Sequence, residues 1–314
     1  MRILTFICSC AALAFALAAW HRITHPCPRR KKTRKRVLLV GLVAWCAYAG
    51  EPQPLISGEI RQQVDSKYMS YGLVDNADPI LTSEASLTAW GLLSIDLAVL
   101  TDTTAHGREA GYGNRKCRHT EFDSGLRVEQ TFTPEDHKGL PTAFRCALGC
   151  LYEHHPNVMG KGAGEPGEDT QFVTVELALP DLWLEPSLIY ERDIRRDNGT
   201  YVNLELGHSF TLIDGADAEG DPALALRLSV SQGLGDTRRT HAYGLAEDHA
   251  GLMDLCLKSA MTWNLGFVSL IGYLAYCDYV FDSALRKSSR RYEASGQEDT
   301  SCHVVIGFAL AVSF

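Results

Sequence analysis

The chain has 314 residues, of which 46% are apolar and 22% are charged, and its mean hydropathy is −0.09. These values exclude a disordered tail, a collagen and a coiled coil, and they allow one large domain or two small ones. The moderate hydropathy argues against a bundle of membrane helices. It does not argue against a transmembrane barrel, whose strands alternate apolar and polar residues.

Charge is distributed unevenly along the chain. Residues 1–49 contain nine Lys or Arg and no Asp or Glu, so residues 50–314 hold the other 21 basic residues and all 38 acidic ones. A body this acidic repels phosphate groups. We therefore expect no nucleic-acid partner.

A basic cluster at 29–36 precedes an apolar run at 37–49, which ends in the small residues Ala47 and Ala49. These are the three parts of a secretory signal, with cleavage expected just after Ala49. The run is shorter than the ~20 residues that a membrane helix needs. Residues 1–49 are thus predicted to be a targeting region with its core at 37–49, and residues 50–314 the exported protein.

A second apolar run, residues 3–20, lies further upstream. We expect residues 1–28 to precede the true start of the protein or to be removed with the signal, and a membrane helix over 3–20 is the alternative. A lipoprotein signal at Cys46 is disfavoured because bulky Trp45 stands where a small residue is expected.

The body is built from segments of about ten residues in which apolar and polar side chains alternate, the pattern of strands with one apolar face. In the last segment, large apolar residues occupy the even positions from Val304 to Phe314. The same alternation recurs at 92–101, 121–132, 143–153, 200–210 and 222–231. Weaker segments are 58–68, 80–90, 170–179, 181–191, 254–264 and 266–281. The twelve segments predict an all-β fold, a single antiparallel up-and-down transmembrane β-barrel.

The connections between these segments alternate in length. Long ones are expected at 69–79, 102–120, 154–169, 232–253 and 282–301. Short ones are expected near Gly91, Pro180 and Leu265, and Asp197-Asn198-Gly199 is a tight-turn signal. A secreted β-sandwich would also alternate, but its strands are usually shorter and its connections are not sorted in this way. One short helix is expected within 283–296.

Aromatic residues gather near the expected strand ends, as in the two girdles of a membrane barrel. The girdle on the short-turn side would contain Trp90, Phe132, Phe210, Trp263 and Phe314. The girdle on the long-loop side would contain Tyr68, Tyr152, Tyr190, Tyr201 and Tyr279.

The end of the chain, Val304–Phe314, resembles the C-terminal signal of Gram-negative outer-membrane proteins, an alternating strand that closes on Phe. The resemblance implies a bacterial outer-membrane location and recognition by the barrel-assembly machinery. The residues that would carry the signal are Phe308, Leu310, Val312 and Phe314.

The segment Ser66–Gly72, followed by Asp75–Pro79, is similar to the first strand and loop of uncharacterised porin-like barrels. One departure is Tyr71, because many of those proteins have Arg before the Gly. The resemblance brings no defined substrate and no catalytic residue.

If the apolar face meets lipid, the polar face lines the lumen. Alternation places there Glu59, Arg61, Asp65, Lys67, Asp96, Asp123, Arg127, Glu129, Arg145, Glu176, Glu185, Glu205, Arg227, Lys258 and Asp278. The residues expected to set selectivity are Asp96, Asp123, Arg127, Glu129, Arg145, Glu205 and Arg227. The acidic excess predicts a passive channel for small polar or ionic solutes with a weak cation preference. The alternative is a closed structural or adhesive barrel, held by paired charges.

Motifs for chemistry are scarce, so no enzyme activity, cofactor or metal is expected. A lipid-processing enzyme would need a Ser and a His on adjacent strands facing lipid, and the neighbours His208 and Ser209 point to opposite faces. His154-His155 offers only two metal ligands on a loop.

Among the body cysteines, Cys146 and Cys150 are too far apart in one strand to pair, and they are expected on the lipid face together with Cys277. One bridge could form among Cys117, Cys256 and Cys302, because export permits oxidation.

Overall fold

The computed structural model describes residues 56–71, 73–76, 79–103, 118–135, 140–154, 169–215, 222–242, 249–279, 281–287 and 303–314. The expected targeting region, with Ala47 and Ala49, lies outside these residues, as do Cys117, His155 and Cys302. The chain divides into two compact units, residues 1–53 with 132–143, and residues 54–131 with 144–314. The second unit contains nearly all of the described residues. In the described part of the chain, no helix has the length and apolarity needed to cross a membrane.

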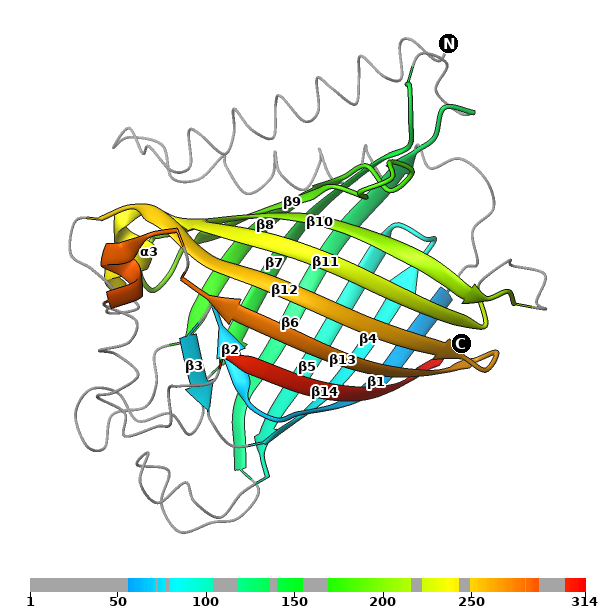
Figure 1. Cartoon of the computed structure of the whole chain (residues 1–314), viewed down its shortest axis with the longest axis horizontal. Helices are drawn as coiled ribbons and strands as arrows, with labels where there is room; N and C mark the ends of the chain where they lie inside the picture. Colours follow the sequence, from blue (N-terminus) through cyan, green and yellow to red (C-terminus); the bar gives the residue numbers. More distant parts are fainter. Residues whose placement is uncertain are drawn as a thin grey trace, which may run out of the picture. The chain divides into compact units, whose positions relative to one another are not determined.

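Twelve antiparallel strands form a closed barrel (Figure 1). They are β1 (Ile56–Asp65), β4 (Ile80–Ala89), β5 (Leu93–Asp102), β6 (Arg118–Phe132), β7 (Phe144–His154), β8 (Thr170–Ala178), β9 (Ser187–Asp193), β10 (Thr200–Ile213), β11 (Leu224–Gly235), β12 (Gly251–Asn264), β13 (Val268–Asp278) and β14 (Val304–Ser313). Strands neighbouring in the chain are neighbours in the barrel, which confirms the predicted up-and-down topology and strand number.

The first and last strands close the barrel. They pair from Glu59 with Ser313 to Asp65 with Gly307. Beyond this ladder, Gly58 and Phe314 exchange two backbone hydrogen bonds of 2.8 and 3.0 Å. No strand of the barrel is left with an open edge, which is the condition for a sheet to cross a bilayer.

The outer face of the barrel is an exposed apolar belt. Ile95 and Leu97 are 48% and 52% exposed, whereas Ser94 beside them is buried. The same alternation exposes Ile60, Val64, Leu87, Leu126, Leu204, Leu228, Leu257, Met261, Leu270, Leu274, Ile306 and Leu310. A soluble protein rarely exposes so continuous an apolar surface, so the belt is the membrane-facing surface of a transmembrane barrel.

The connections differ between the two ends of the barrel. On the turn side, where the strand pairs β4–β5 and β12–β13 are joined, they range from three residues in those two pairs to eleven at 133–143. Trp90 and Gly91 form a two-residue turn with φ of 55° and 60°, closed by a 3.1 Å hydrogen bond from Leu92 N to Ala89 O. Positive φ at both central residues matches the right-handed twist of the flanking strands. On the other end, the loop side, the connections are longer, with 194–199 as the short exception.

The connection between β8 and β9 corrects one expectation. The expected strand 181–191 with a very short turn at Pro180 is wrong, because residues 179–186 form a compact loop and β9 begins only at Ser187. Pro180 and Pro186 have no N–H group to donate to a ladder. The loop is closed by hydrogen bonds from Leu179 N to Pro186 O (3.0 Å) and from Glu185 N to Leu182 O (2.8 Å).

The loop side carries additional structure. A two-stranded sheet of β2 (Tyr68–Ser70) and β3 (Leu73–Asn76) follows β1, so the expected strand 58–68 ends early, at Asp65. A short helix, α3 (Thr237–Ala242), lies between β11 and β12, and residues 283–287 form a further helical turn after β13. The helix expected within 283–296 is therefore confirmed for its first residues, and the rest lies outside the described part.

The expected aromatic girdles are confirmed in part, for four of the five turn-side residues. On the turn side Trp90, Phe210, Trp263 and Phe314 are all exposed, between 41% and 66%. On the loop side the expectation is wrong for Tyr201 and Tyr279, which are 5% and 0% exposed. Tyr201 lies at an odd position of β10, whose even positions face outward, and Tyr279 lies beyond the end of β13. Tyr68 belongs to β2 rather than to the barrel.

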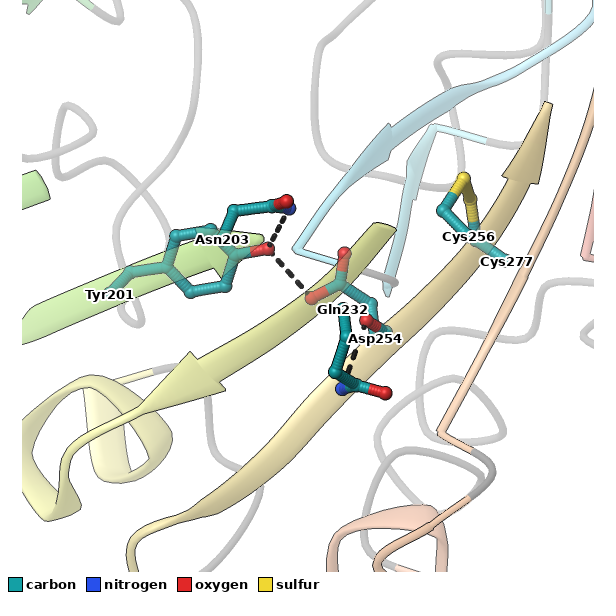
Figure 2. Close-up of a disulfide and its surroundings, with 6 residues drawn as sticks. All are labelled: Tyr201, Asn203, Gln232, Asp254, Cys256 and Cys277. Carbon is teal, nitrogen blue, oxygen red and sulfur yellow. Dashed lines mark hydrogen bonds between the residues drawn. A yellow bond between two sulfur atoms is a disulfide. The ribbon is translucent and has the colours of Figure 1, made fainter. Parts of the chain in front are cut away.

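A disulfide joins Cys256 and Cys277, which stand directly opposite each other in β12 and β13 (Figure 2). The expected lipid-facing position of Cys277 is wrong, because it shares the interior face with Cys256 and Lys258. A bridge limited to Cys117, Cys256 and Cys302 is wrong for the same reason: opposite positions of neighbouring strands bring the Cα atoms to 4.1 Å. Cys146 and Cys150 are free, as predicted.

Peptide mapping will test this pairing. After alkylation of the unfolded, unreduced protein and digestion, a linked peptide pair containing Cys256 and Cys277 is expected, and Cys146 and Cys150 should carry the alkyl group. The Cys256→Ser variant is the control, in which Cys277 should become alkylated. Linkage of Cys256 to any other cysteine in the wild type would contradict the assignment.

Candidate functional site: the charged interior of the barrel

The residues between the apolar positions point into the barrel. The seven residues expected to set selectivity all occupy interior positions by this alternation: Asp96, Asp123, Arg127, Glu129, Arg145, Glu205 and Arg227. For example, Arg227 precedes exposed Leu228, and Glu205 follows exposed Leu204. The structure arranges most of these residues in ion-pair clusters.

The first cluster lies on β6, β7 and β8 toward the turn side. Arg145 Nη2 donates a hydrogen bond to Glu176 Oε1. Arg127 Nη1 lies 4.0 Å from the other oxygen of Glu176 and 3.5 Å from Glu129 Oε2. Two arginines thus share two carboxylates, so the cluster is neutral in total.

The second cluster is centred on Arg227 of β11. Its guanidinium donates to Glu205 Oε1 at 3.0 Å, to Ser209 Oγ at 3.2 Å and also to Glu185 Oε2. Glu185 comes from the loop 179–186, where its φ is 39°, and not from a strand as expected. The side chain nevertheless reaches the interior, because Gly207 N hydrogen-bonds Leu184 O at 2.8 Å and holds the loop against β10.

A third set of contacts follows β1. Arg61 Nη2 donates to Gln63 Oε1 at 2.7 Å, and Gln63 Nε2 donates to Asp65 Oδ2 at 2.7 Å. Tyr273 of β13 donates its hydroxyl hydrogen to Asp65, and Lys258 Nζ lies 4.4 Å from the centre of the Tyr273 ring. These contacts extend along β1 and reach across β14 to β13 and β12.

A wall of carboxylates lies on β6 and β7 toward the loop side. Carboxylate oxygens of Glu121, Asp123 and Glu153 lie within 4.8 Å of one another. Acidic groups are common without a bound ion, and the three carboxyl groups make this part of the interior acidic. It contrasts with the neutral pairs nearer the turn side.

Buried polar groups bridge β10, β11 and β12 near the loop end (Figure 2). The Tyr201 hydroxyl donates to Asp254 Oδ1 at 2.9 Å and accepts from Asn203 Nδ2 at 3.0 Å. Gln232 Nε2 donates to the backbone oxygen of Asp254 at 3.2 Å. These hydrogen bonds tie the three strands together, which rigidifies this end of the barrel, although Gln232 Oε1 is buried without a hydrogen-bond partner among the described residues.

A compact cap fills part of the loop end of the barrel, and it consists of Tyr71, Tyr201, Arg239, Met253, Tyr279 and Leu285. Arg239 of α3 is 1% exposed and lies between the rings of Tyr71 and Phe172, each 5.1 Å from its guanidinium carbon. Its Nη1 also lies 3.6 Å from Asp197 Oδ2. Burial raises the pKa of the Asp197 carboxyl, and the charge of Arg239 opposes that rise.

The Asp-Asn-Gly signal predicted a tight turn at 197–199, and the structure confirms it. Helix α3 packs directly against this turn. Asn198 has φ 53°. A Cβ atom at Gly199 would lie 2.7 Å from the backbone nitrogen of Arg239, so the helix approaches too closely for any other residue.

Asp282 joins two loop-side connections. Its Oδ1 accepts the backbone N–H groups of Ala284 and Leu285 at 3.0 and 3.1 Å, which caps the helical turn 283–287. Its Oδ2 lies 2.8 Å from His249 Nε2. Burial alone would raise the pKa of Asp282, but the hydrogen bonds from His249 and the two amides outweigh it and lower the pKa below the usual value.

The lowered pKa gives a prediction for acid. The ionised carboxylate stabilises this junction at every pH above the usual carboxyl value of ~3.9, and the contribution is lost as the pH falls through the lowered pKa of the folded protein. Amide hydrogen exchange of Ala284 and Leu285, corrected for intrinsic rates, should therefore accelerate only in strong acid. In Asp282→Asn the acid dependence should vanish. The same acid response in that variant would contradict the assignment.

The side chains considered for chemistry are used in packing. His208 lies on the outer face, between Trp183 and Phe210 with ring centroids 5.4 and 4.6 Å away, while Ser209 accepts from Arg227 in the interior. Their predicted separation onto opposite faces is confirmed. His154 Nδ1 lies 2.8 Å from Asp169 Oδ1 at the loop-side rim.

The fold and this interior define the class: the chain is a transmembrane β-barrel with an apolar exterior and a charged interior. No protein family and no curated protein matches it in sequence. Among solved structures, the KdgM porin has 7% identity and a TM-score of 0.44, with 82% of this chain and 99% of that chain covered. An outer-membrane channel from Pseudomonas putida F1 has 9% identity and a TM-score of 0.43, with 85% and 98% covered. At these identities no solute or mechanism is transferred from them.

Proposed function

We propose that the protein is a passive channel for small polar or ionic solutes in a bacterial outer membrane. The observation that carries the proposal is a closed barrel with an apolar exterior and a charged interior. Connections that are mostly longer at one end than at the other agree with the outer-membrane arrangement. We propose no catalytic residue, cofactor or metal for this channel.

We further propose a weak cation preference. The turn-side clusters pair their arginines with carboxylates, so they contribute little net charge. Toward the loop side, carboxylate oxygens of Glu121, Asp123 and Glu153 lie within 4.8 Å of one another, so the interior face of β6 and β7 is acidic there. A confined negative wall concentrates cations and repels anions.

A closed structural or adhesive barrel is the second candidate. Its support is the shared ion pairs of Arg127, Arg145 and Arg227, together with the buried cap at the loop end. Conductance separates the two. Purified protein in a planar bilayer should give current steps of stable size if it is a channel, and a folded, inserted barrel without current would favour the closed barrel.

The C-terminal strand is proposed to serve as the signal for the barrel-assembly machinery. Phe308, Leu310 and Phe314 are exposed on the outer face, at 66%, 43% and 66%, where a partner could contact them, and Val312 lies between them on the same face. Lipid of the outer membrane would cover the same face after insertion.

Charge reversal tests the interior. In the double variant Asp123→Lys and Glu129→Lys, the reversal potential in a salt gradient should move toward anions. The first replacement puts a positive charge in the acidic wall, and the second removes one of the two carboxylates near Arg127. Asp214→Lys is the matched control, since that residue is exposed in the turn-side connection after β10. An unchanged potential in the double variant would refute the selectivity role.

A further inference from the structure

Tyr71 is bound inside the loop end of the barrel by groups from distant parts of the chain. Its hydroxyl donates to Glu191 Oε2 at 3.0 Å. Its ring meets the Tyr201 ring edge-on at 4.7 Å, and the guanidinium carbon of Arg239 lies 5.1 Å from its centre. Its backbone oxygen accepts the Tyr279 hydroxyl at 2.5 Å. One residue between β2 and β3 is thus attached to β9, β10, α3 and the end of β13.

The cap that Tyr71 completes leaves no room for water among its inner members. Met253, Tyr279 and Leu285 are 0% exposed, and Tyr71 packs against them and Tyr201. Solutes cannot pass between side chains packed to this density. With Tyr71 in place, these packed side chains therefore close the loop end beside β10, β12 and the segment after β13.

The element that carries Tyr71 is a small sheet that is not part of the barrel. β2 and β3 have three and four residues and form a sheet of their own, separate from the barrel. A two-stranded sheet of this size is at best marginally stable alone. Its position therefore depends on anchoring contacts, among which those of the Tyr71 ring and hydroxyl enter the barrel.

We propose that Tyr71 is the latch of an internal gate: its phenol ring, seated between Arg239, Tyr201 and Glu191, holds the loop end partly closed, and its release widens the channel. The inference rests on the proposed channel function. The seat recognises a phenol by three features, a carboxylate for the hydroxyl, a guanidinium above the ring and an aromatic edge beside it. The same three features predict that a free phenol can bind in place of the Tyr71 side chain.

The test is chemical complementation in planar bilayers. The wild type should show a low conductance level. Tyr71→Ala should lose that level and show a higher one, because the latch and the packing around it are gone. Added p-cresol, which is the tyrosine side chain as a free molecule, should fill the vacated seat and restore the low level, as small molecules do in cavities left by truncated core residues. It should not change the wild type.

Two further variants make the test specific. Tyr190→Ala removes a tyrosine from an outward position beside Glu191, and it should conduct like the wild type, with no response to p-cresol. Tyr71→Phe keeps the ring and removes only the hydroxyl that Glu191 accepts, so the barrel should fold and the low level should be shorter-lived. An unchanged lifetime in Tyr71→Phe would overturn the latch even where Tyr71→Ala does not fold.

The outcomes separate the latch from the channel. If wild type and Tyr71→Ala conduct equally, the latch is wrong and the channel stands. If only Tyr71→Ala conducts, the latch is upheld and the wild type is a closed barrel at rest. If neither folded, inserted protein conducts, both proposals fail.

Discussion

The pairing of β1 with β14 is the contact on which everything else depends. In lipid every backbone N–H and C=O group must find a partner within the protein, and a sheet achieves this only by closing on itself. Closure divides each strand into an outer and an inner side, so side chains of the outer row meet lipid and those of the inner row share a narrow space. The apolar belt, the ion pairs and the cap are all consequences of that division.

Much of the barrel could be predicted because it follows a period of two. Alternation along Val304–Phe314 and eleven further segments identified the strands, their number and most of their faces, including the interior position of Arg227 and Glu205. The errors arose where the period does not apply. The segment 181–191 alternates in sequence, but Pro180 and Pro186 flank a loop there and the strand begins after it. Tyr201 was assigned to a girdle because it is aromatic, although its position in the alternation faces the interior.

The cap could not be predicted from local pattern. Tyr71, Arg239, Tyr279 and Leu285 come from three separate connections, and each is unremarkable among its neighbours in the sequence. Only the closed barrel brings these connections to one opening. The Asp-Asn-Gly signal at 197–199 was the single local clue, since it correctly marked a turn, but nothing in it showed that a helix would pack against Gly199. Interior charges have the same limitation: alternation gives their side of the sheet and not their partners.

The bridge between Cys256 and Cys277 has a consequence for how the strands can align. It joins two residues that face each other directly across neighbouring strands. If β13 slid by one residue against β12, every side chain of the slid strand would change sides, and Tyr273 would exchange its polar surroundings for lipid. A covalent link at one rung forbids that displacement along the whole hairpin. The disulfide therefore fixes the register between β12 and β13, and with it the side of the sheet on which each residue of these two strands lies.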